Sequence, residues 1–414
     1  MNLFSTTIVL AYRNLFRNRA RTISTLLAIA VGLLGLTVLD GFITYSMDRY
    51  RDAIIRSGTG HLQIFRSRQA LDEGDDNPIP FLLDKPRRMA EELRALPEVD
   101  DVMPALDFSA LLSDGNENLS VQVSAYPLDQ AARDLSKSTL TAGRDLAPGE
   151  TGRVLLGTCL ARRLKLRPGA TIQLFAQSRG GGVNTESLTV EGITSSGIKE
   201  VDDISVHMSL SDAQSLLEVG SVAKLVVFLK HSGDTGRVMR LLAAAPPSSA
   251  LSGMMVESWD KLSLGFQYAN SMYQLILAVA RFVVLIVALF SISGSLTLSV
   301  IERYREMGTL RALGTPRRRL TLLLAFEGLF LGAAGAALGS FLAMALTASI
   351  NVLGGITFPA EPGMSVSAVN ILFTPRVGVL AQNGAALVLA SIAASLAPGA
   401  LGTRRSVAEL LRSV

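Results

Sequence analysis

The residue types that most often carry catalysis or bind metals are few and scattered in this chain. The three histidines are His61, His207 and His231, and Cys159 is the only cysteine. No histidine has a partner at the spacing of a zinc site, and none forms a recognisable triad motif with a serine. The glycine run Gly180–Gly182 lacks the Lys-Ser/Thr pair of a phosphate-binding loop, and no G-x-x-x-x-G-K-[ST] string occurs. We therefore predict no catalytic, cofactor or metal site, and a chain that is not itself an enzyme.

The most informative short segment is rich in arginine and reads IERYREMGTLRALGTPRRRL from Ile301 to Leu320. Its apolar residues recur at helical spacing and a glycine and a proline end the pattern; these positions are Met307, Leu310, Leu313, Gly314 and Pro316. A short amphipathic helix outside the membrane is suited to docking into a groove on a partner protein. The alternative is a plain connector whose arginines only fix the membrane topology.

The elements that position this segment are apolar and long. The chain is 49% hydrophobic and has a mean hydropathy of +0.37, which is rare for a soluble protein of this length. Residues 46–268 carry 24 Lys/Arg and 29 Asp/Glu, whereas the remaining residues carry 15 arginines and 6 acids. The basic part is thus the apolar part, which argues against nucleic-acid binding. We predict four transmembrane α-helices with a large α+β extracytoplasmic domain between helices 1 and 2.

The predicted boundaries follow from hydropathy and charge. They are a cytoplasmic amphipathic helix at 1–21, transmembrane helix 1 at 22–45, the periplasmic domain at 46–268, helix 2 at 269–300, a cytoplasmic coupling loop at 301–319, helix 3 at 320–350, a short periplasmic loop at 351–376, helix 4 at 377–398 and a cytoplasmic tail at 399–414.

Arginines orient these helices. They precede helix 1, fill the 301–319 loop and recur in the tail, so the positive-inside rule places both termini and the loop in the cytoplasm. All of these assignments agree with an even number of crossings. The 46–268 domain and the 351–376 loop then lie on the opposite side.

Three charged residues lie within or near the predicted spans. Asp40 and Arg281 fall at similar depth at the outer interface, either as separate snorkelling groups or as an ion pair that ties helix 1 to helix 2. Glu327 lies inside helix 3 and is followed by four glycines on one helix face: Gly328, Gly332, Gly335 and Gly339. Such a face lets another backbone approach closely, so we interpret it as a helix-packing surface with a polar anchor.

The 46–268 domain alternates strand and helix signals. Strands are expected at His61–Phe65, on both sides of an Asp114-Gly115 turn, and at Lys224–Lys230, with a helix from Pro86. Residues 128–200 are predicted to form a β-rich insert, so that the domain has two lobes. Within it, Gln177–Glu186 is expected to be a polar loop.

The string ERYREMGTLRALG, Glu302 to Gly314, resembles the coupling-helix signature of ABC-transporter permeases of the MacB/FtsX type. The RNLFRNRART entry to helix 1, the glycine ladder and the RRSVAELLR tail are similar to that family as well. The resemblance spans nearly the whole chain. It implies a dimer of permeases, with an identical or a different second copy, and a cytoplasmic ABC ATPase dimer that binds ATP and Mg²⁺. The ATPase-coupling residues would be Glu302, Arg303, Arg305, Glu306, Met307, Gly308, Leu310, Arg311, Ala312, Leu313 and Gly314.

Three further strings look like the lipoprotein-releasing branch of this family: GHLQIF from Gly60, VLLGTCLARRLKLRPGATIQL from Val154, and GIKEVDDISVHMSLSDAQSLL from Gly197. This resemblance implies a bacterial inner-membrane permease that extracts lipoproteins, or a similar amphiphile, from the outer leaflet and passes them to a periplasmic carrier. By position, a carrier-docking loop would comprise Gln177, Ser178, Arg179, Gly180, Gly181 and Gly182. Residues on one face of helices 1 and 2 would line a substrate cavity, or else simply face lipid: Leu34, Val38, Phe42, Leu275, Phe282 and Ile286.

Two other functions fit the same sequence pattern. One is a non-transporting scaffold that transmits a conformational change to periplasmic cell-wall hydrolases. The other is the permease of an exporter linked by an adaptor to an outer-membrane channel. The external domain is longer than expected for the scaffold, which favours the lipoprotein-releasing reading.

Overall fold

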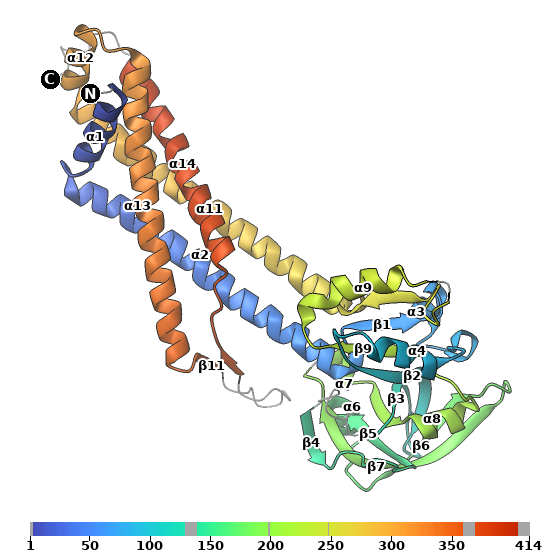
Figure 1. Ribbon diagram of the computed structural model, residues 1–414. Coiled ribbons are helices and arrows are strands. Elements are labelled where there is room, and N and C mark those ends of the chain that lie inside the picture. Colours follow the sequence, from blue (N-terminus) through green and yellow to red (C-terminus); the bar gives the residue numbers. More distant parts are fainter. Residues whose placement is uncertain (1–2, 129–138, 198, 247, 359–368, 405–414) are drawn as a thin grey trace. The chain divides into compact units, whose positions relative to one another are not determined.

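The computed structural model describes residues 3–128, 139–197, 199–246, 248–358 and 369–404. The chain forms two compact units (Figure 1). Of the described residues, those up to Asp48 and those from Ala269 onward form the helical unit, and those within Arg49–Tyr268 form the sheet unit.

The helical unit is built from long apolar helices. Four helices are long and apolar enough to cross a membrane, as predicted. The helices are α1 (Leu3–Leu15), α2 (Arg19–Ile54), α11 (Leu264–Glu302), α12 (Tyr304–Ala312), α13 (Arg317–Val352) and α14 (Val377–Arg404). Helices 1 and 2 are expected to continue beyond the membrane as a stalk, and both helices are longer than the predicted spans: α2 continues through Ser46–Ile54 and α11 already begins at Leu264. Hydropathy marks where a helix meets lipid, whereas charged helix formers carry it on without a break.

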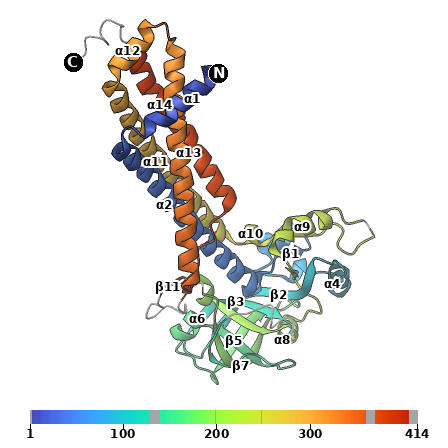
Figure 2. The same cartoon turned by 60° about the vertical axis from the view of Figure 1, so that its left-hand side comes forward.

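The four glycines of α13 serve two different neighbours. Gly328 and Gly332 lie against Ser391 of α14, which runs beside α13 in both views (Figures 1 and 2). Gly335 and Gly339 instead face α2, where a Cβ would meet Ile29 and Ala30. The predicted packing face is therefore divided between α14 and α2.

The segment predicted as a short loop at 351–376 contains a two-stranded antiparallel hairpin among its described residues. Its strands are β11 (Ile356–Phe358) and β12 (Val369–Ile371). Asn351 closes the connection, since its Nδ2 donates to the carbonyl of Phe373 at 2.8 Å and its Oδ1 accepts from the Phe373 N–H at 2.8 Å. The segment still connects α13 to α14, but its strands are too short for a clear period-2 pattern, so the sequence did not indicate the hairpin.

The sheet unit is α+β, as predicted, and its strands form one ten-stranded mixed sheet. The order is β10-β1-β9-β2-β3-β8-β5-β7-β4, with β6 pairing β2 and β7. The strands are β1 (Leu62–Phe65), β2 (Val99–Ser113), β3 (Asn118–Tyr126), β4 (Thr139–Gly143), β5 (Arg153–Gly157), β6 (Thr171–Gln177), β7 (Val183–Ser195), β8 (Ser205–Ser209), β9 (Lys224–Leu229) and β10 (Met255–Ser258). The helices and short turns are η1 (Ile55–Thr59), α3 (Arg68–Glu73), η2 (Ile79–Phe81), α4 (Pro86–Arg94), α6 (Thr158–Arg163), α7 (Lys199–Asp202), α8 (Leu210–Leu217), η3 (Ser232–Asp234), α9 (Thr235–Ala243) and α10 (Trp259–Leu262).

The long strand β2 is shared by two hydrophobic cores. Its first half pairs with β9 and its second half with β3. One core lies under α4 and α9, around Leu62, Leu93 and Val227. The other lies under α6 and α8, around Leu106, Val206 and Leu216. The domain therefore has two cores along one sheet, and residues 128–200 do not make up the second one alone, because β3, β8 and half of β2 complete it.

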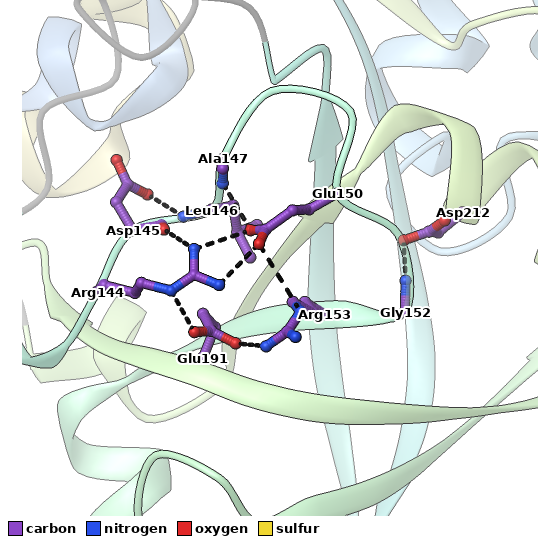
Figure 3. A network of polar contacts seen from close by, with 9 residues as sticks. All are labelled: Arg144, Asp145, Leu146, Ala147, Glu150, Gly152, Arg153, Glu191 and Asp212. Carbon is purple, nitrogen blue, oxygen red and sulfur yellow. Dashed lines mark hydrogen bonds and ion pairs between the residues drawn. The ribbon is translucent and has the colours of Figure 1, made fainter.

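A network of ion pairs fastens the segment before β5 to β7 (Figure 3). Arg144 binds Glu150 at 2.7 Å through Nη2 and Glu191 at 2.6 Å through Nε. Arg153 also donates to Glu191, and the Ala147 N–H donates to Glu150 at 2.7 Å. The Arg144 hydrogen bond and the Ala147 N–H lower the pKa of Glu150 to about 2.

This network should make stability depend on pH in acid. The pKa of Glu150 is about 2 in the folded chain and about 4.3 in an unfolded one. The contribution of this carboxylate to the free energy of unfolding is therefore full above about pH 5. It is lost as pH falls from about 4.3 to about 2. Glu150→Gln should lower Tm at pH 7 and flatten the fall in Tm between about pH 5 and 2, measured on the detergent-solubilised chain. Glu117→Gln, at an exposed glutamate, is the control; equal effects of the two substitutions would contradict the assignment.

Candidate functional site

The arginine-rich segment folds as the predicted short helix. The chain leaves α11 at Glu302, breaks helical geometry at Arg303 (φ −113°, ψ 18°), and forms α12. Gly314 ends it with a φ of +90°, and the Thr315 N–H donates to the Leu310 carbonyl at 3.0 Å. A glycine suits this left-handed position, which most residues adopt only at a cost.

The apolar residues of α12 do not share one outward face. Met307 is 2% exposed and packs with Val300 and Leu324, so it holds α12 to α11 and α13. Leu313 is 79% exposed, and Leu310 lies between these extremes. The expected apolar docking face is thus divided: Met307 is part of the core, and Leu313 is exposed.

Ion pairs connect α12 and the end of α11 to the N-terminal helices. Arg17, between α1 and α2, binds Glu306 at 2.6 Å, and Arg21 of α2 binds Glu302 at 2.6 Å. Arg303 also binds Glu306, at 3.0 Å. Hydrogen bonds first from Arg17 and then from Arg303 lower the pKa of Glu306, so this carboxylate is ionised at neutral pH.

Glu327 of α13 has partners that the sequence did not reveal. Its Oε1 accepts a hydrogen bond from Asn14 Nδ2 of α1 at 2.6 Å and one from Arg303 Nη1 at 3.3 Å. Glu327 is 2% exposed. It was interpreted as a polar anchor on a packing face, and the structure extends this, because Glu327 joins α1, α13 and the α11–α12 break. Asn14, Arg17 and Arg21 were not among the predicted site residues, although they lie in or beside the RNLFRNRART string.

A small apolar cavity of about 170 Å³ lies between α1, α12 and α13. Leu10, Leu310 and Leu323 line it together with the aliphatic part of Arg319. Apolar side chains of α1, α12 and α13 therefore meet around this cavity, apart from the ion pairs described above.

The expected Asp40–Arg281 pair is not formed as a direct ion pair in the described part of the chain. Asp40 is 6% exposed, and the cations acting on it are Arg376 first and Arg281 second. Arg376 is brought near by the segment before α14, which packs on α2: the Thr374 N–H donates to the Gly41 carbonyl at 3.5 Å. No local pattern in the sequence predicts this contact.

The residues predicted to line a substrate cavity fall into two groups. Those on α2 (Leu34, Val38 and Phe42) are half-buried, and Phe42 packs on Phe373 with ring centroids 6.5 Å apart. Those on α11 are exposed, with Leu275 and Phe282 each at 65%. Ile286 is exposed too. The α11 face is therefore free in the single chain to meet lipid, cargo or a second copy.

The predicted loop at Gln177–Glu186 is shorter than expected. The strand β7 begins at Val183, which pairs with Gln177, so only Ser178–Gly182 form the turn. Its backbone is tied down, since the Arg179 N–H donates to the Leu217 carbonyl of α8 at 2.9 Å. The residues Val183–Glu186 are predicted as part of the loop but continue the hairpin with β6. Docking of a carrier at the Ser178–Gly182 turn stays a prediction.

Two known protein-family profiles match this chain. The profile of the MacB-like periplasmic core domain matches residues 22–245, and that of the FtsX-like permease C-terminal region matches residues 278–406. The chain belongs to the MacB/FtsX-type permeases. Members of this family are the membrane subunits of ABC transporters, and the sheet unit of this permease is its periplasmic domain.

Individual relatives are distant from this permease. The lipoprotein-releasing system transmembrane protein LolC of Neisseria meningitidis is 24% identical over 57% of this chain, and the match spans only 58% of that protein. LolE of Haemophilus influenzae is 22% identical over 94% of this chain and 92% of its own length. Among solved structures, the periplasmic region of MacB from Actinobacillus actinomycetemcomitans is similar at 15% identity, covering 51% of this chain and 95% of that one with a TM-score of 0.34.

Proposed function

We propose that this permease converts a push on α12 from a separate ABC ATPase into a rearrangement of its membrane helices and periplasmic domain. In this proposal both termini and α12 lie in the cytoplasm, as the arginine distribution favours. The observation that carries the proposal is the set of ion pairs that link the α12 region to the α1–α2 turn, α2 and α13.

These contacts support concerted motion of the helices. A displacement of α12 acts on Arg17 through Glu306 and on Glu327 through Arg303. Exposed pairs such as Arg17–Glu306 are each worth about 1 kcal/mol or less, so they can break and re-form during a cycle. The buried Glu327 cluster is costly to break, so it keeps α1 and α13 moving with α12.

For the cargo we propose a lipoprotein, or a similar amphiphile, taken from the outer leaflet of the inner membrane. Support comes from the match to LolE over nearly the full length of both chains. The exposed apolar residues of α11 are suited to contact acyl chains or a second permease. Release of a fluorescent lipoprotein from proteoliposomes that hold the permease, its ATPase and ATP would test this; ATP turnover without release would favour a scaffold function instead.

The ATPase-coupling role predicts a specific effect at Leu313. Because its side chain is 79% exposed, Leu313→Asp should leave the permease folded. It should weaken binding of the co-expressed ATPase by at least about tenfold, the usual cost of losing a buried apolar anchor from an interface. Affinity is measured by pull-down and by stimulation of ATPase activity in detergent.

The matched control is Leu353→Asp, at an equally exposed leucine (84%) at the other end of α13. This variant should bind the ATPase like the parent chain. Normal binding by Leu313→Asp, or an equal loss in both variants, would show that α12 does not dock the ATPase.

A further inference from the structure

A basic recess of about 470 Å³ lies in the periplasmic domain, where the chain leaves α2. One wall is the end of α2 and the turn η1, and the other is the loop after β9. We call it the Arg56 recess; its polar lining is Arg51, Asp52, Arg56, His61, Lys230, His231 and Ser232. It plays no part in the coupling site described above.

The charges in the Arg56 recess do not cancel. Its acidic residue, Asp52, accepts hydrogen bonds from Arg51 Nε and Nη2 at 3.1 and 3.0 Å, so these two charges neutralise each other. Arg56 is exposed and forms no hydrogen bond or ion pair with the residues that the structure describes. Lys230 donates one N–H to the carbonyl of Pro97 at 2.8 Å, which leaves its charge uncompensated. Neither Arg56 nor Lys230 forms an ion pair with a described residue, although Asp52 and Asp100 act electrostatically on His61 beside them.

A fixed histidine orients a further donor. The Leu229 N–H donates to His61 Nδ1 at 3.1 Å, so the ring proton of this buried histidine lies on Nε2. Burial is also the main cause that lowers the pKa of His61, so the ring is neutral. His61 Nε2 then donates to Ser232 Oγ at 3.0 Å, and the Ser232 hydroxyl keeps its own proton for another acceptor.

We propose that the Arg56 recess binds a phosphate group, as free phosphate or as the phosphodiester of a lipid headgroup. A guanidinium, an ammonium and a hydroxyl donor from two sides of one recess match an anion with several acceptor oxygens. Such a ligand would also bridge η1 to the loop after β9. The turn η1 contains Gly58 at a φ of +99° and precedes Gly60 at +65°, so the ligand would brace the glycine-containing connection by which α2 enters the domain.

The test uses the full-length permease in a non-ionic detergent at constant ionic strength set with chloride. Binding of inorganic phosphate, of short-chain phosphatidylglycerol and of short-chain phosphatidylcholine is followed by calorimetry and by the shift in Tm. Arg56→Gln should lower the affinity at least about tenfold, since it removes a charge-assisted pair. Arg56→Lys should weaken binding less. The matched control is Arg87→Gln, at an exposed arginine of α4 outside the recess, which should bind like the parent.

Saturable binding of inorganic phosphate that depends on Arg56 would support recognition of the free anion. Binding of the lipids alone, again lost in Arg56→Gln, would support a lipid headgroup. The proposal is overturned if no ligand binds above the chloride control, or if Arg56→Gln and Arg87→Gln lose equal affinity.

Discussion

Replacing Glu327 by alanine is expected to destabilise the permease by about 3 kcal/mol, the cost typical of removing one partner from a buried charge pair. Arg303, 12% exposed in its side chain, would lose the carboxylate that it meets at 3.3 Å. Asn14 would lose its acceptor at 2.6 Å. The measurement is thermal unfolding in detergent, together with ATP-dependent activity in proteoliposomes with the partner ATPase.

Two substitutions separate burial from charge. Glu327→Gln keeps an acceptor for Asn14 but leaves Arg303 with Glu306 as its counter-charge in place of the buried Glu327, so its effect should be intermediate. Glu306→Ala removes a glutamate whose side chain is 46% exposed, and should cost less than about 1 kcal/mol. If Glu327→Ala were no more harmful than Glu306→Ala, the buried cluster would not be what holds α1 and α13 together.

The membrane helices could be predicted from the sequence because lipid demands long apolar segments, and four such segments are present. The residues at which these helices end could not be predicted. Arg49 and Arg51 lie beyond the apolar part of α2, yet the helix continues to Ile54. Backbone hydrogen bonding carries the helix on, and hydropathy does not report it.

The coupling helix could be predicted, since spacing and a terminating glycine are local signals. Its partners could not, because Asn14 and Glu327 lie 313 residues apart, and Arg17 and Glu306 lie 289 apart. An isolated carboxylate in an apolar helix indicates that a partner exists but does not identify it. The arginines before and at the start of α2 and the glutamates among the arginines that follow α11 are opposite in charge. This pattern could have suggested the pairs Arg17–Glu306 and Arg21–Glu302.

In the periplasmic domain, strands with buried residues on at least one face were the ones predicted. Every residue of β9 is buried, and its run of apolar residues made it recognisable. In contrast, every residue of the edge strand β4 is exposed, and its TLTAG sequence has no apolar alternation. Its pairing with β7 supplies the hydrogen bonds that define it, and this pairing is not encoded locally.

Gly339→Ala is expected to destabilise the membrane helices by about 1–3 kcal/mol, as overpacking of a close interface does. A Cβ at this position would lie 2.8 Å from the carbonyl oxygen of Ala30 and 3.0 Å from its Cα. These are backbone atoms of α2, so no side-chain rotation can relieve the contact, and α2 and α13 must separate. Thermal unfolding in detergent measures the loss, and transport with the partner ATPase should fall with it.

The matched controls are Gly35→Ala and Gly294→Ala, in α2 and α11, where no atom of the described residues lies within 4 Å of the added Cβ. Both should leave Tm unchanged or raise it, because alanine is favoured over glycine in a helix by about 0.5–1 kcal/mol. All three substitutions add the same methyl group to an apolar helix. A Tm that falls for Gly339→Ala but not for the two controls therefore distinguishes close packing from helix propensity. An unchanged or raised Tm for Gly339→Ala would mean that α13 does not approach α2 at the distance on which the division of the glycine face rests.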